Sequence, residues 1–358
     1  MAGFDFDLFV IGGGSGGVRA ARFAGQRGAR VALAESARMG GTCVNVGCIP
    51  KKLYSYAAEY AEGFVDAKGY GWRLDAPPTL DWEALKANRA KAITHLNGIY
   101  EKLMVGAQVR RMQGHARLLD GHTVEVRHDD GQITRHSAAT ILLATGGEPW
   151  VPELPGREGV VTSNDIFDLP RFPRRLVVVG GGYIACEFAS IFHGMGSEVT
   201  LLYRGTQILR GFDNEVRDFA AEEMRKAGVD IRVQADVTRV EAVGDGRRVH
   251  LKDGSVVEAD VVLYATGRRA NVRGLGLEAA GVRQTEHGAI AVDEHYATSA
   301  PGIYALGDVV GRLELTPVAL AEAMALVDHL FGPAPGKPKR TMDYENVPTA
   351  VFTHPPIG

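Results

Sequence analysis

Two cysteines near the start of the chain have the spacing of a possible redox pair. Cys43 and Cys48 stand in the run GGTCVNVGCIPK at residues 40–51. On a regular helix a separation of five residues places two side chains about 140° apart, and on a strand it places them on opposite faces. A disulfide between them therefore requires irregular backbone, which Asn45 and Gly47 can supply.

The second cysteine stands where a thiolate would be stabilised. Pro50 is typical of the first turn of a helix, and the residues from Lys51 to about Glu59 favour helix. A helix N-terminus and a nearby lysine both favour the charged, reactive form of Cys48. A metal site is a weaker interpretation, because no Cys-x-x-Cys or histidine lies nearby; so is a pair of buried, inert thiols. The third cysteine, Cys186, is most simply a small core residue.

The composition describes an ordinary globular chain of more than one domain. The 358 residues are 45% hydrophobic and 23% charged, with a formal net charge of −3. Two or three packed units are expected, and a nucleic-acid partner is not. No segment approaches the ~20 apolar residues of a membrane span, and residues 1–10 lack the basic cluster of a signal peptide. Three cysteines are too few for a secreted disulfide scaffold, so we expect a reducing cytoplasm.

A first glycine-rich motif is typical of dinucleotide binding. Gly12-x-Gly14-x-x-Gly17 follows an apolar strand expected at 7–11 and precedes a helix expected at 18–27. The first glycine makes the turn, the second admits the pyrophosphate, and the third lets helix and strand pack closely. The next strand, 30–35, ends on Glu35, where a carboxylate binds ribose hydroxyls. The Gly-Lys-Ser/Thr ending of a phosphate loop is absent, which disfavours an ATPase.

A second motif of this kind has a different charge at its strand end. Gly180-x-Gly182-x-x-Ala185 follows a strand expected at 176–179, and the next strand, 198–203, is followed by Arg204 and Arg210. Guanidinium groups bind phosphate in bidentate fashion, whereas a carboxylate there would repel a 2′-phosphate. The second site is therefore expected to prefer NADPH to NADH. The alternative is that both arginines are solvated surface charges.

The remaining chain contains hairpins, a linker and one more candidate strand. Hairpins are expected at 122–136 and 248–258, with Asp-Gly turns at 130–131 and 253–254. Residues 332–338 read as a linker, and 349–353 read as the start of a new strand.

Taken together, these motifs resemble the class I pyridine nucleotide–disulfide oxidoreductases. The run at 40–52 looks like their active-site signature, and its Val-Asn-Val-Gly interior is shared by glutathione reductases. The runs at 12–17, 265–271 and 304–308 also match. The resemblance implies an α/β fold with two Rossmann-like dinucleotide-binding domains, for FAD and NADPH, and a truncated interface domain. The expected domains are 1–146 (FAD, first part), 147–270 (NADPH), 271–342 (FAD/central, second part) and 343–358 (start of the interface domain).

The resemblance also implies roles for individual residues. Cys43 would be the thiol that exchanges with substrate, and Cys48 the thiol beside the flavin. Lys51 would lie near flavin N5, paired with Glu187, and Tyr183 would cover the flavin face. The implied FAD-binding residues are Gly12, Gly14, Ser15, Gly16, Gly17, Glu35, Thr42, Cys43, Lys51, Ala116, Thr145, Gly146, Asp308 and Thr316. The implied NADPH-binding residues are Gly180, Gly181, Gly182, Tyr183, Ile184, Ala185, Glu187, Arg204, Arg210, Gly267 and Glu314. The implied substrate-binding residues are Ser15, Arg22 and Tyr100.

The sequence departs from the family pattern in places that concern the substrate. Met324 stands where better-known glutathione reductases have a substrate-binding arginine, and Ala92 stands at an aromatic position. In the family an interface domain follows the segment that matches 354–358 and supplies a general-acid histidine with its glutamate partner. We expect that domain to lie outside these residues, and His354 to belong to the entry strand rather than to act as the acid.

The implied activity is reduction of glutathione disulfide by NADPH through FAD and the Cys43–Cys48 pair, with homodimers in the intact family. Three alternatives stay open: a reductase of another small disulfide, a mercuric reductase, and a fragment that binds FAD and NADPH without turnover. A dihydrolipoamide dehydrogenase is disfavoured by Arg204, because an acid is expected there for NAD. No nucleic-acid, membrane or metal partner is expected.

Overall fold

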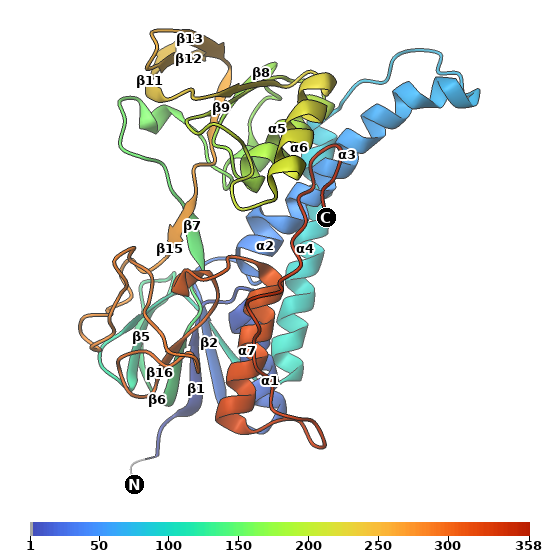
Figure 1. Ribbon diagram of the computed structural model, residues 1–358. Coiled ribbons are helices and arrows are strands. Elements are labelled where there is room, and N and C mark those ends of the chain that lie inside the picture. The colour runs from blue at the N-terminus through green and yellow to red at the C-terminus, as the bar shows by residue number, and fades with distance from the viewer. Residues whose placement is uncertain (1–2) are drawn as a thin grey trace. The chain divides into compact units, whose positions relative to one another are not determined.

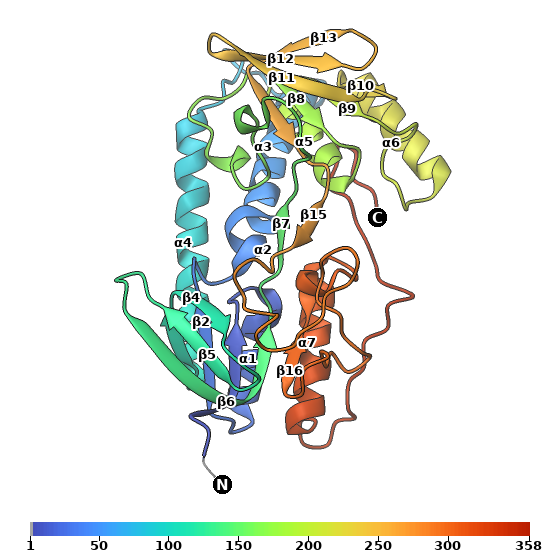
Figure 2. The same ribbon diagram turned by 90° about the vertical axis from the view of Figure 1, so that its left-hand side faces the viewer.

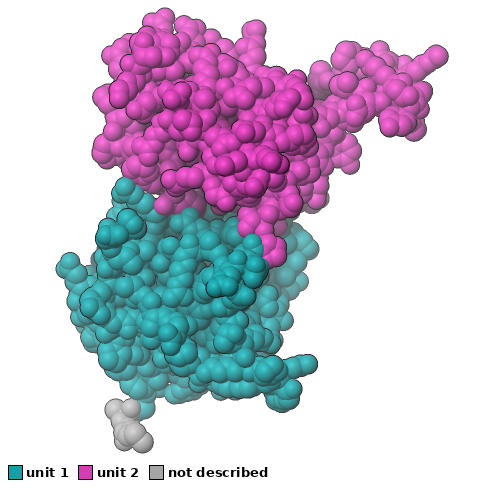
Figure 3. Space-filling view, viewed as in Figure 1, with its two compact units in different colours: residues 1–45, 92–148, 269–347 teal, residues 46–91, 149–268, 348–358 magenta. Residues whose placement is uncertain are grey.

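The computed structural model describes residues 3–358, which form two compact units (Figure 3). Unit 1 contains the described residues of 1–45 together with 92–148 and 269–347. Unit 2 contains 46–91, 149–268 and 348–358. The domain boundaries expected from the sequence differ in assigning 46–91 to the FAD-binding part. Compactness does not identify a ligand, so those ligand-based boundaries remain a proposal.

Unit 1 is built around a seven-stranded sheet in the order β3-β2-β1-β6-β5-β4, with β16 also paired to β6 (Figure 1). The pairs β1–β2, β2–β3, β1–β6 and β16–β6 are parallel, and β4–β5 and β5–β6 are antiparallel. Its strands are β1 (Phe6–Ile11), β2 (Val31–Glu35), β3 (Arg110–Gln113), β4 (His115–Leu118), β5 (Thr123–Arg127), β6 (Ile133–Leu143) and β16 (Ile303–Ala305).

The two faces of β1 face different hydrophobic clusters, as alternation along a strand requires. Leu8 and Val10 pack with residues of α1 (Ser15–Gln26) and α7 (Thr316–Phe331). Phe9 and Ile11 pack with the β4–β6 layer and the loops before and after β16. The helices α1 and α7 lie side by side (Figures 1 and 2). A strand buried on both faces explains the continuous apolar run at the start of the chain.

Unit 2 repeats the arrangement on a smaller scale. Its parallel sheet has the order β10-β9-β8-β14, and a three-stranded antiparallel sheet has the order β11-β12-β13. Leu176 and Val178 of β8 belong to one cluster, with α5, and Val177 and Val179 belong to another, with the antiparallel sheet. The strands are β8 (Arg175–Val179), β9 (Glu198–Tyr203), β10 (Asp230–Val233), β11 (Val237–Val243), β12 (Gly246–Leu251), β13 (Val256–Ala259) and β14 (Val261–Tyr264). The helices are α3 (Cys48–Asp66), α5 (Tyr183–Gly194) and α6 (Asn214–Ala227).

The other elements are short, apart from α4 (Trp82–Gly106), which passes from unit 2 to unit 1 after Lys91. Helix α2 (Gly41–Val46) precedes α3, and β7 (Gly147–Pro149) and β15 (Arg268–Ala270) lie where the chain crosses between units. The 3₁₀ turns in the described part of the chain are η1 (Ala67–Tyr70), η2 (Arg157–Gly159), η3 (Ile166–Asp168) and η4 (Gly307–Val310). Within residues 3–358, no helix has both the length and the apolar character that crossing a membrane requires.

Most expected elements are present, and two differ. Both strand–glycine loop–helix–strand units are present, and so are both hairpins, β5–β6 and β12–β13. The helix after Cys48 runs to Asp66, beyond the expected Glu59. The strand expected at 349–353 is wrong: in this segment only Val351 pairs, through an isolated bridge to Ile357. A strand needs a neighbour for its backbone groups, and β propensity alone does not provide one.

Candidate functional site

The first glycine motif forms a cradle at the N-terminus of α1 in unit 1. Gly12 has φ +110°, and a Cβ there would lie 2.3 Å from the carbonyl oxygen of Ala144. A Cβ on Gly17 would lie 2.0 Å from the carbonyl oxygen of Gly12, so α1 and β1 approach as only glycine allows. Gly14 differs, because the nearest atom to its Cβ would be the Gly41 Cα, 3.8 Å away. This space beside a helix N-terminus fits a diphosphate.

Glu35 is held at the edge of this cradle. The Gly13 N–H donates to one of its carboxylate oxygens at 2.6 Å, and the Ala37 N–H donates to the other at 2.7 Å. The backbone thus fixes the carboxylate at the end of β2, in the position that a ribose-binding acid takes in this type of unit.

The other expected FAD residues are distributed over unit 1, with one exception. Thr145 and Gly146 follow β6; the Thr145 hydroxyl donates to the carbonyl of Asn271 at 2.7 Å, and Gly146 has φ +69°. Asp308 lies in η4 and Thr316 begins α7. The exception is Lys51, which belongs to unit 2.

The two cysteines lie on two consecutive helices, α2 and α3. Cys43 is half-buried within α2, and Cys48 is the exposed first residue of α3. Gly47 between the helices has φ −140° and ψ −117°, which breaks the helical path. The expected location of Cys48 at a helix N-terminus is confirmed.

Asn45 has a different structural role from the irregular backbone expected of it. It is helical, and its side-chain amide donates to the carbonyls of Gly41 at 2.9 Å and Met39 at 3.2 Å. Asn97 of α4 donates to the Asn45 side-chain oxygen at 3.0 Å and to the Met39 carbonyl at 2.8 Å. Asparagine thus stabilises α2 through its side chain rather than by irregular backbone. Sequence reasoning missed Asn97, and no local motif marks it.

Lys51 and Glu187 form the ion pair that the resemblance implies. The Lys51 Nζ lies 2.8 Å from a Glu187 carboxylate oxygen, and the two side chains are only 12% and 6% exposed. The same oxygen accepts the Phe352 N–H at 2.9 Å, and the Phe352 ring centroid lies 4.2 Å from the Lys51 Nζ. A buried ion pair requires such additional partners. Phe352 was not singled out from the sequence, because it is far along the chain from both partners.

The second glycine motif forms a cradle at the N-terminus of α5. Gly180 has φ +140°, and its Cβ would lie 2.3 Å from the carbonyl oxygen of Ala265. A Cβ on Gly181 would lie 2.5 Å from the Tyr203 ring, whereas Gly182 has nothing within 4 Å of its Cβ position. The Leu209 N–H donates to the Gly181 carbonyl at 2.6 Å and so ties this cradle to the loop after β9.

The loop after β9 presents two arginines. Arg204 and Arg210 are both exposed. An exposed guanidinium group can bind an anion such as a phosphate. Gly267, with φ +127°, follows β14 in the same unit, whereas Glu314 belongs to unit 1.

A family comparison identifies this arrangement. The family described as pyridine nucleotide-disulphide oxidoreductase matches residues 6–323. The chain belongs to this family.

Several curated relatives of this oxidoreductase are named glutathione reductase. That of Burkholderia cepacia is 49% identical over 355 residues, covering 99% of this chain and 77% of the relative. The chloroplastic/mitochondrial enzyme of Pisum sativum is 43% identical, covering 99% of this chain and 65% of the relative. That of a Nostoc species is 43% identical, covering 98% and 77%. Among solved structures, a Cu(II) complex of the HOCl-induced flavoprotein disulfide reductase RclA of Escherichia coli has a TM-score of 0.87 at 30% identity, covering 98% of this chain and 76% of that one. The fold is thus that of a flavoprotein disulfide reductase.

The expected substrate residues of this oxidoreductase occur in unit 1. Ser15 begins α1, and the half-buried Arg22 of the same helix lies with its guanidinium 5.3 Å from the Phe23 ring centroid. Tyr100 lies on α4 and packs against the cluster that includes α1. Met324 is 8% exposed on α7, so it is part of the core of unit 1. Ala92 is half-buried on α4.

His354 lies against α3. Both ring nitrogens of His354 are engaged: Nδ1 lies 3.1 Å from a Glu62 oxygen, and Nε2 lies 3.3 Å from the Ser55 hydroxyl. The residue thus fastens its segment to α3.

Burial raises the pKa of Cys186 to about 12, which keeps that thiol neutral and fits the expected core role. Over residues 3–358, no group of three His, Cys, Asp or Glu side chains is arranged to hold a metal ion.

Proposed function

We propose that this chain reduces glutathione disulfide with electrons from NADPH, through FAD and the pair Cys43–Cys48. One observation carries the proposal: the CVNVGC run, with Cys48 at a helix N-terminus, occurs in a chain 43–49% identical to three glutathione reductases. The two glycine cradles give the chain two sites that fit dinucleotides.

The chain's own residues have separable tasks in binding. Glu35 and the glycines at 12–17 would hold FAD by its ribose and diphosphate, with Asp308 and Thr316 at the ribityl and flavin end. The glycines at 180–182 would hold the NADPH diphosphate, and Arg204 and Arg210 its 2′-phosphate. When bound, FAD supplies two-electron transfer from NADPH to the cysteine pair.

The cysteines would carry out thiol–disulfide exchange with the substrate. The Cys43 thiolate attacks one sulfur of glutathione disulfide, so a mixed disulfide forms and one glutathione thiolate leaves. The Cys48 thiolate then attacks the Cys43 sulfur, which forms the Cys43–Cys48 disulfide and releases the second glutathione. Each departing thiolate takes up a proton, and NADPH returns two electrons to the pair. The helix N-terminus at Cys48 favours the thiolate form of the reduced residue, which this attack requires.

Lys51 and Glu187 would fix a positive charge close to the reactive elements. Lys51 lies one turn after Cys48 on α3, and its ammonium is held by Glu187 and covered by the Phe352 ring. Held in this way, the ammonium cannot reach solvent freely, so its charge acts at one place.

A second candidate is a reductase of another small disulfide. Met324, at the position of a substrate-binding arginine, is buried on α7. Glutathione disulfide is acidic, so loss of a cation favours a less acidic substrate. The cysteine chemistry would be unchanged.

Steady-state assays distinguish these proposals. NADPH oxidation and thiol production are measured with glutathione disulfide and with a neutral and a cationic disulfide of similar size. We expect two thiols per NADPH, and no turnover by Cys43→Ser. A higher kcat/KM for a non-acidic disulfide would favour the second candidate. Nucleotide binding without turnover of any disulfide would contradict both and leave a binding fragment.

A further inference from the structure

Helix α7 contains a buried carboxyl group that the proposed chemistry does not use. Glu322 is 1% exposed. One carboxylate oxygen accepts the Gly307 N–H at 2.7 Å, and the other accepts the Tyr344 hydroxyl at 2.6 Å. Burial raises the pKa of Glu322, and both hydrogen bonds counteract this effect. Burying a carboxyl group costs free energy unless hydrogen bonds replace those it loses with water.

The Gly307 bond closes a loop onto the helix that follows it. Gly307 begins η4, and the loop ends where α7 begins at Thr316. Glu322 therefore reaches back fifteen residues to the start of the loop. Gly307 has φ +76°, and its Cβ would lie 3.5 Å from the Ala319 Cβ, so the backbone lies directly against α7. Asp308 and Thr316, at the two ends of this loop, are both expected to contact FAD.

Tyr344 reaches Glu322 from a segment that lies along α7. The Lys339 Nζ lies 3.1 Å from Nδ1 of His329, and the Arg340 N–H donates to Asp328 at 3.0 Å. Tyr344 then meets Glu322, so residues 339–344 follow α7 towards its N-terminus. We call residues 339–344 the strap.

The strap also touches the loop itself. Arg312, within the loop, donates to the Tyr344 hydroxyl at 3.0 Å, and its guanidinium lies 5.2 Å from the Tyr344 ring centroid and 5.7 Å from that of Tyr296. Burial and the bond to Glu322 raise the pKa of Tyr344, so the phenol remains a donor at neutral pH. Helix, loop and strap thus share one hydrogen-bonded centre.

We propose that Glu322 is a positioning residue for FAD: with Tyr344 it clamps the loop from Gly307 to Leu315 in the conformation in which Asp308 and Thr316 bind the cofactor. The proposal rests on the FAD site of the proposed function. Glu322 would act through the backbone of Gly307 and would not touch the cofactor itself.

The test measures FAD release from the purified flavoprotein on dilution, by the rise in flavin fluorescence. Glu322→Leu should release FAD at least about fivefold faster, because the Gly307 N–H loses its acceptor; Tyr344→Phe should do so about two- to threefold faster. Glu322→Gln keeps an acceptor and should stay close to the unmodified rate. Circular dichroism at saturating FAD records the unfolding midpoint of each variant.

Asp328 provides the matched control. It is a second buried carboxylate on α7, 2% exposed, and it binds Arg27 and the Arg340 N–H rather than the loop. Asp328→Asn, which keeps an acceptor for the Arg340 N–H of the strap while losing the charge that pairs with Arg27, should lower the midpoint while changing FAD release by less than about twofold.

Two results would overturn the proposal. One is FAD release at the unmodified rate from both Glu322→Leu and Tyr344→Phe. If Glu322→Leu fails to fold, Tyr344→Phe decides this outcome by itself. The other is equal acceleration by the Asp328 variant, which would mean a general loosening of α7. A purified, unmodified chain that binds no flavin would overturn the proposed FAD site itself. That outcome can be distinguished from the two above, in which the unmodified chain does bind FAD.

Discussion

Lys51 and the helix that carries Cys43 are each held by residues from a distant part of the sequence. Glu187 holds Lys51, and the Phe352 N–H holds Glu187. Asn97 holds Asn45, which stabilises the helix of Cys43. Because a sulfur or ammonium displaced by about 1 Å loses much of its effect, these supporting contacts matter as much as the reactive atoms.

The cysteines should have unequal spectroscopic signatures. If Cys48 is the thiol beside the bound flavin, its thiolate should give a long-wavelength absorption band when NADPH or dithionite reduces the protein. We expect Cys48→Ser to abolish this band. Cys43→Ser should make the band permanent, because Cys48 then has no partner with which to form a disulfide. Identical spectra for the two variants and the unmodified protein would refute the assignment.

The two arginines should distinguish the nucleotides. Each guanidinium that binds a 2′-phosphate contributes roughly 1.5–3 kcal/mol. Arg204→Ala with Arg210→Ala should therefore slow flavin reduction by NADPH at least about tenfold, equivalent to ~1.4 kcal/mol. Reduction by NADH should change little. Arg225→Ala on α6 serves as a control for lost surface charge. Equal losses with both nucleotides would mean that the arginines do not read the phosphate.

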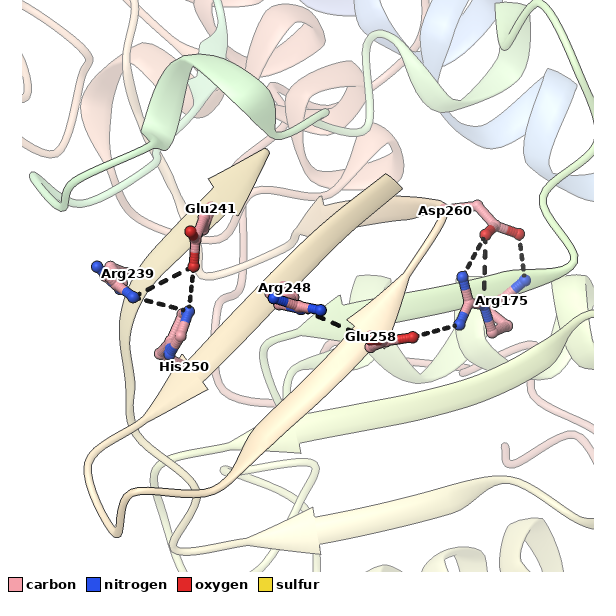
Figure 4. A network of polar contacts seen from close by, with 7 residues as sticks. All are labelled: Arg175, Arg239, Glu241, Arg248, His250, Glu258 and Asp260. Atoms are coloured by element: carbon pink, nitrogen blue, oxygen red, sulfur yellow. Dashed lines mark hydrogen bonds and ion pairs between the residues drawn. The ribbon is translucent and has the colours of Figure 1, made fainter. Parts of the chain in front are cut away.

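At the scale of elements, polar contacts join the antiparallel sheet to β8 (Figure 4). Arg175 of β8 donates to Asp260 through its backbone N–H at 2.9 Å and through its guanidinium at 3.1 Å, and to Glu258 at 3.0 Å. On β11 and β12, His250 lies 2.8 Å from Glu241. These groups are partly exposed, so their contribution to stability is small compared with the clusters beneath the sheet.

Removing the central arginine should therefore have a modest, salt-dependent effect. Arg175→Met should lower the free energy of unfolding only slightly, and less at high salt. Partial burial would raise the pKa of Asp260, but its bonds to Arg175 hold that pKa below the ordinary 3.8. This stabilisation is thus present above pH 3.8 and lost as the pH falls through the folded pKa. Urea unfolding at several pH values measures it. Arg248→Met, which removes a single 3.6 Å pair to Glu258, should cost less.

At the scale of the whole molecule, each unit has its own buried clusters and its own dinucleotide cradle. The clusters around β1 lie in unit 1, and those around β8 lie in unit 2. All three tryptophans, Trp72, Trp82 and Trp150, belong to unit 2. Flavin and tryptophan fluorescence are therefore expected to report on different units.

Ligands should stabilise the two units unequally. A ligand at a hundred times its Kd stabilises its site by ~2.7 kcal/mol. Excess FAD should raise the midpoint of flavin release more than that of the tryptophan transition, and NADP⁺ should do the reverse. Thermal unfolding followed by both signals tests this. Transitions that coincide and move together with either ligand would show instead that the units unfold as one.

The sequence by itself determined the features that contiguous residues encode. The two glycine motifs, the helix start at Cys48, the arginines after β9 and the hairpin turns depend on local conformation, so their residues could be recognised in order along the chain. The family and the α/β fold followed from them.

Only the tertiary structure decided which distant groups meet. No spacing links Glu322 to Gly307 and Tyr344, or Phe352 to Glu187, because these contacts depend on how helices, loops and the strap pack together. The strand expected at 349–353 failed for a related reason. Its residues favour β structure, but a strand exists only where a neighbouring backbone lies in register to accept its hydrogen bonds, and only Val351 and Ile357 meet that condition here.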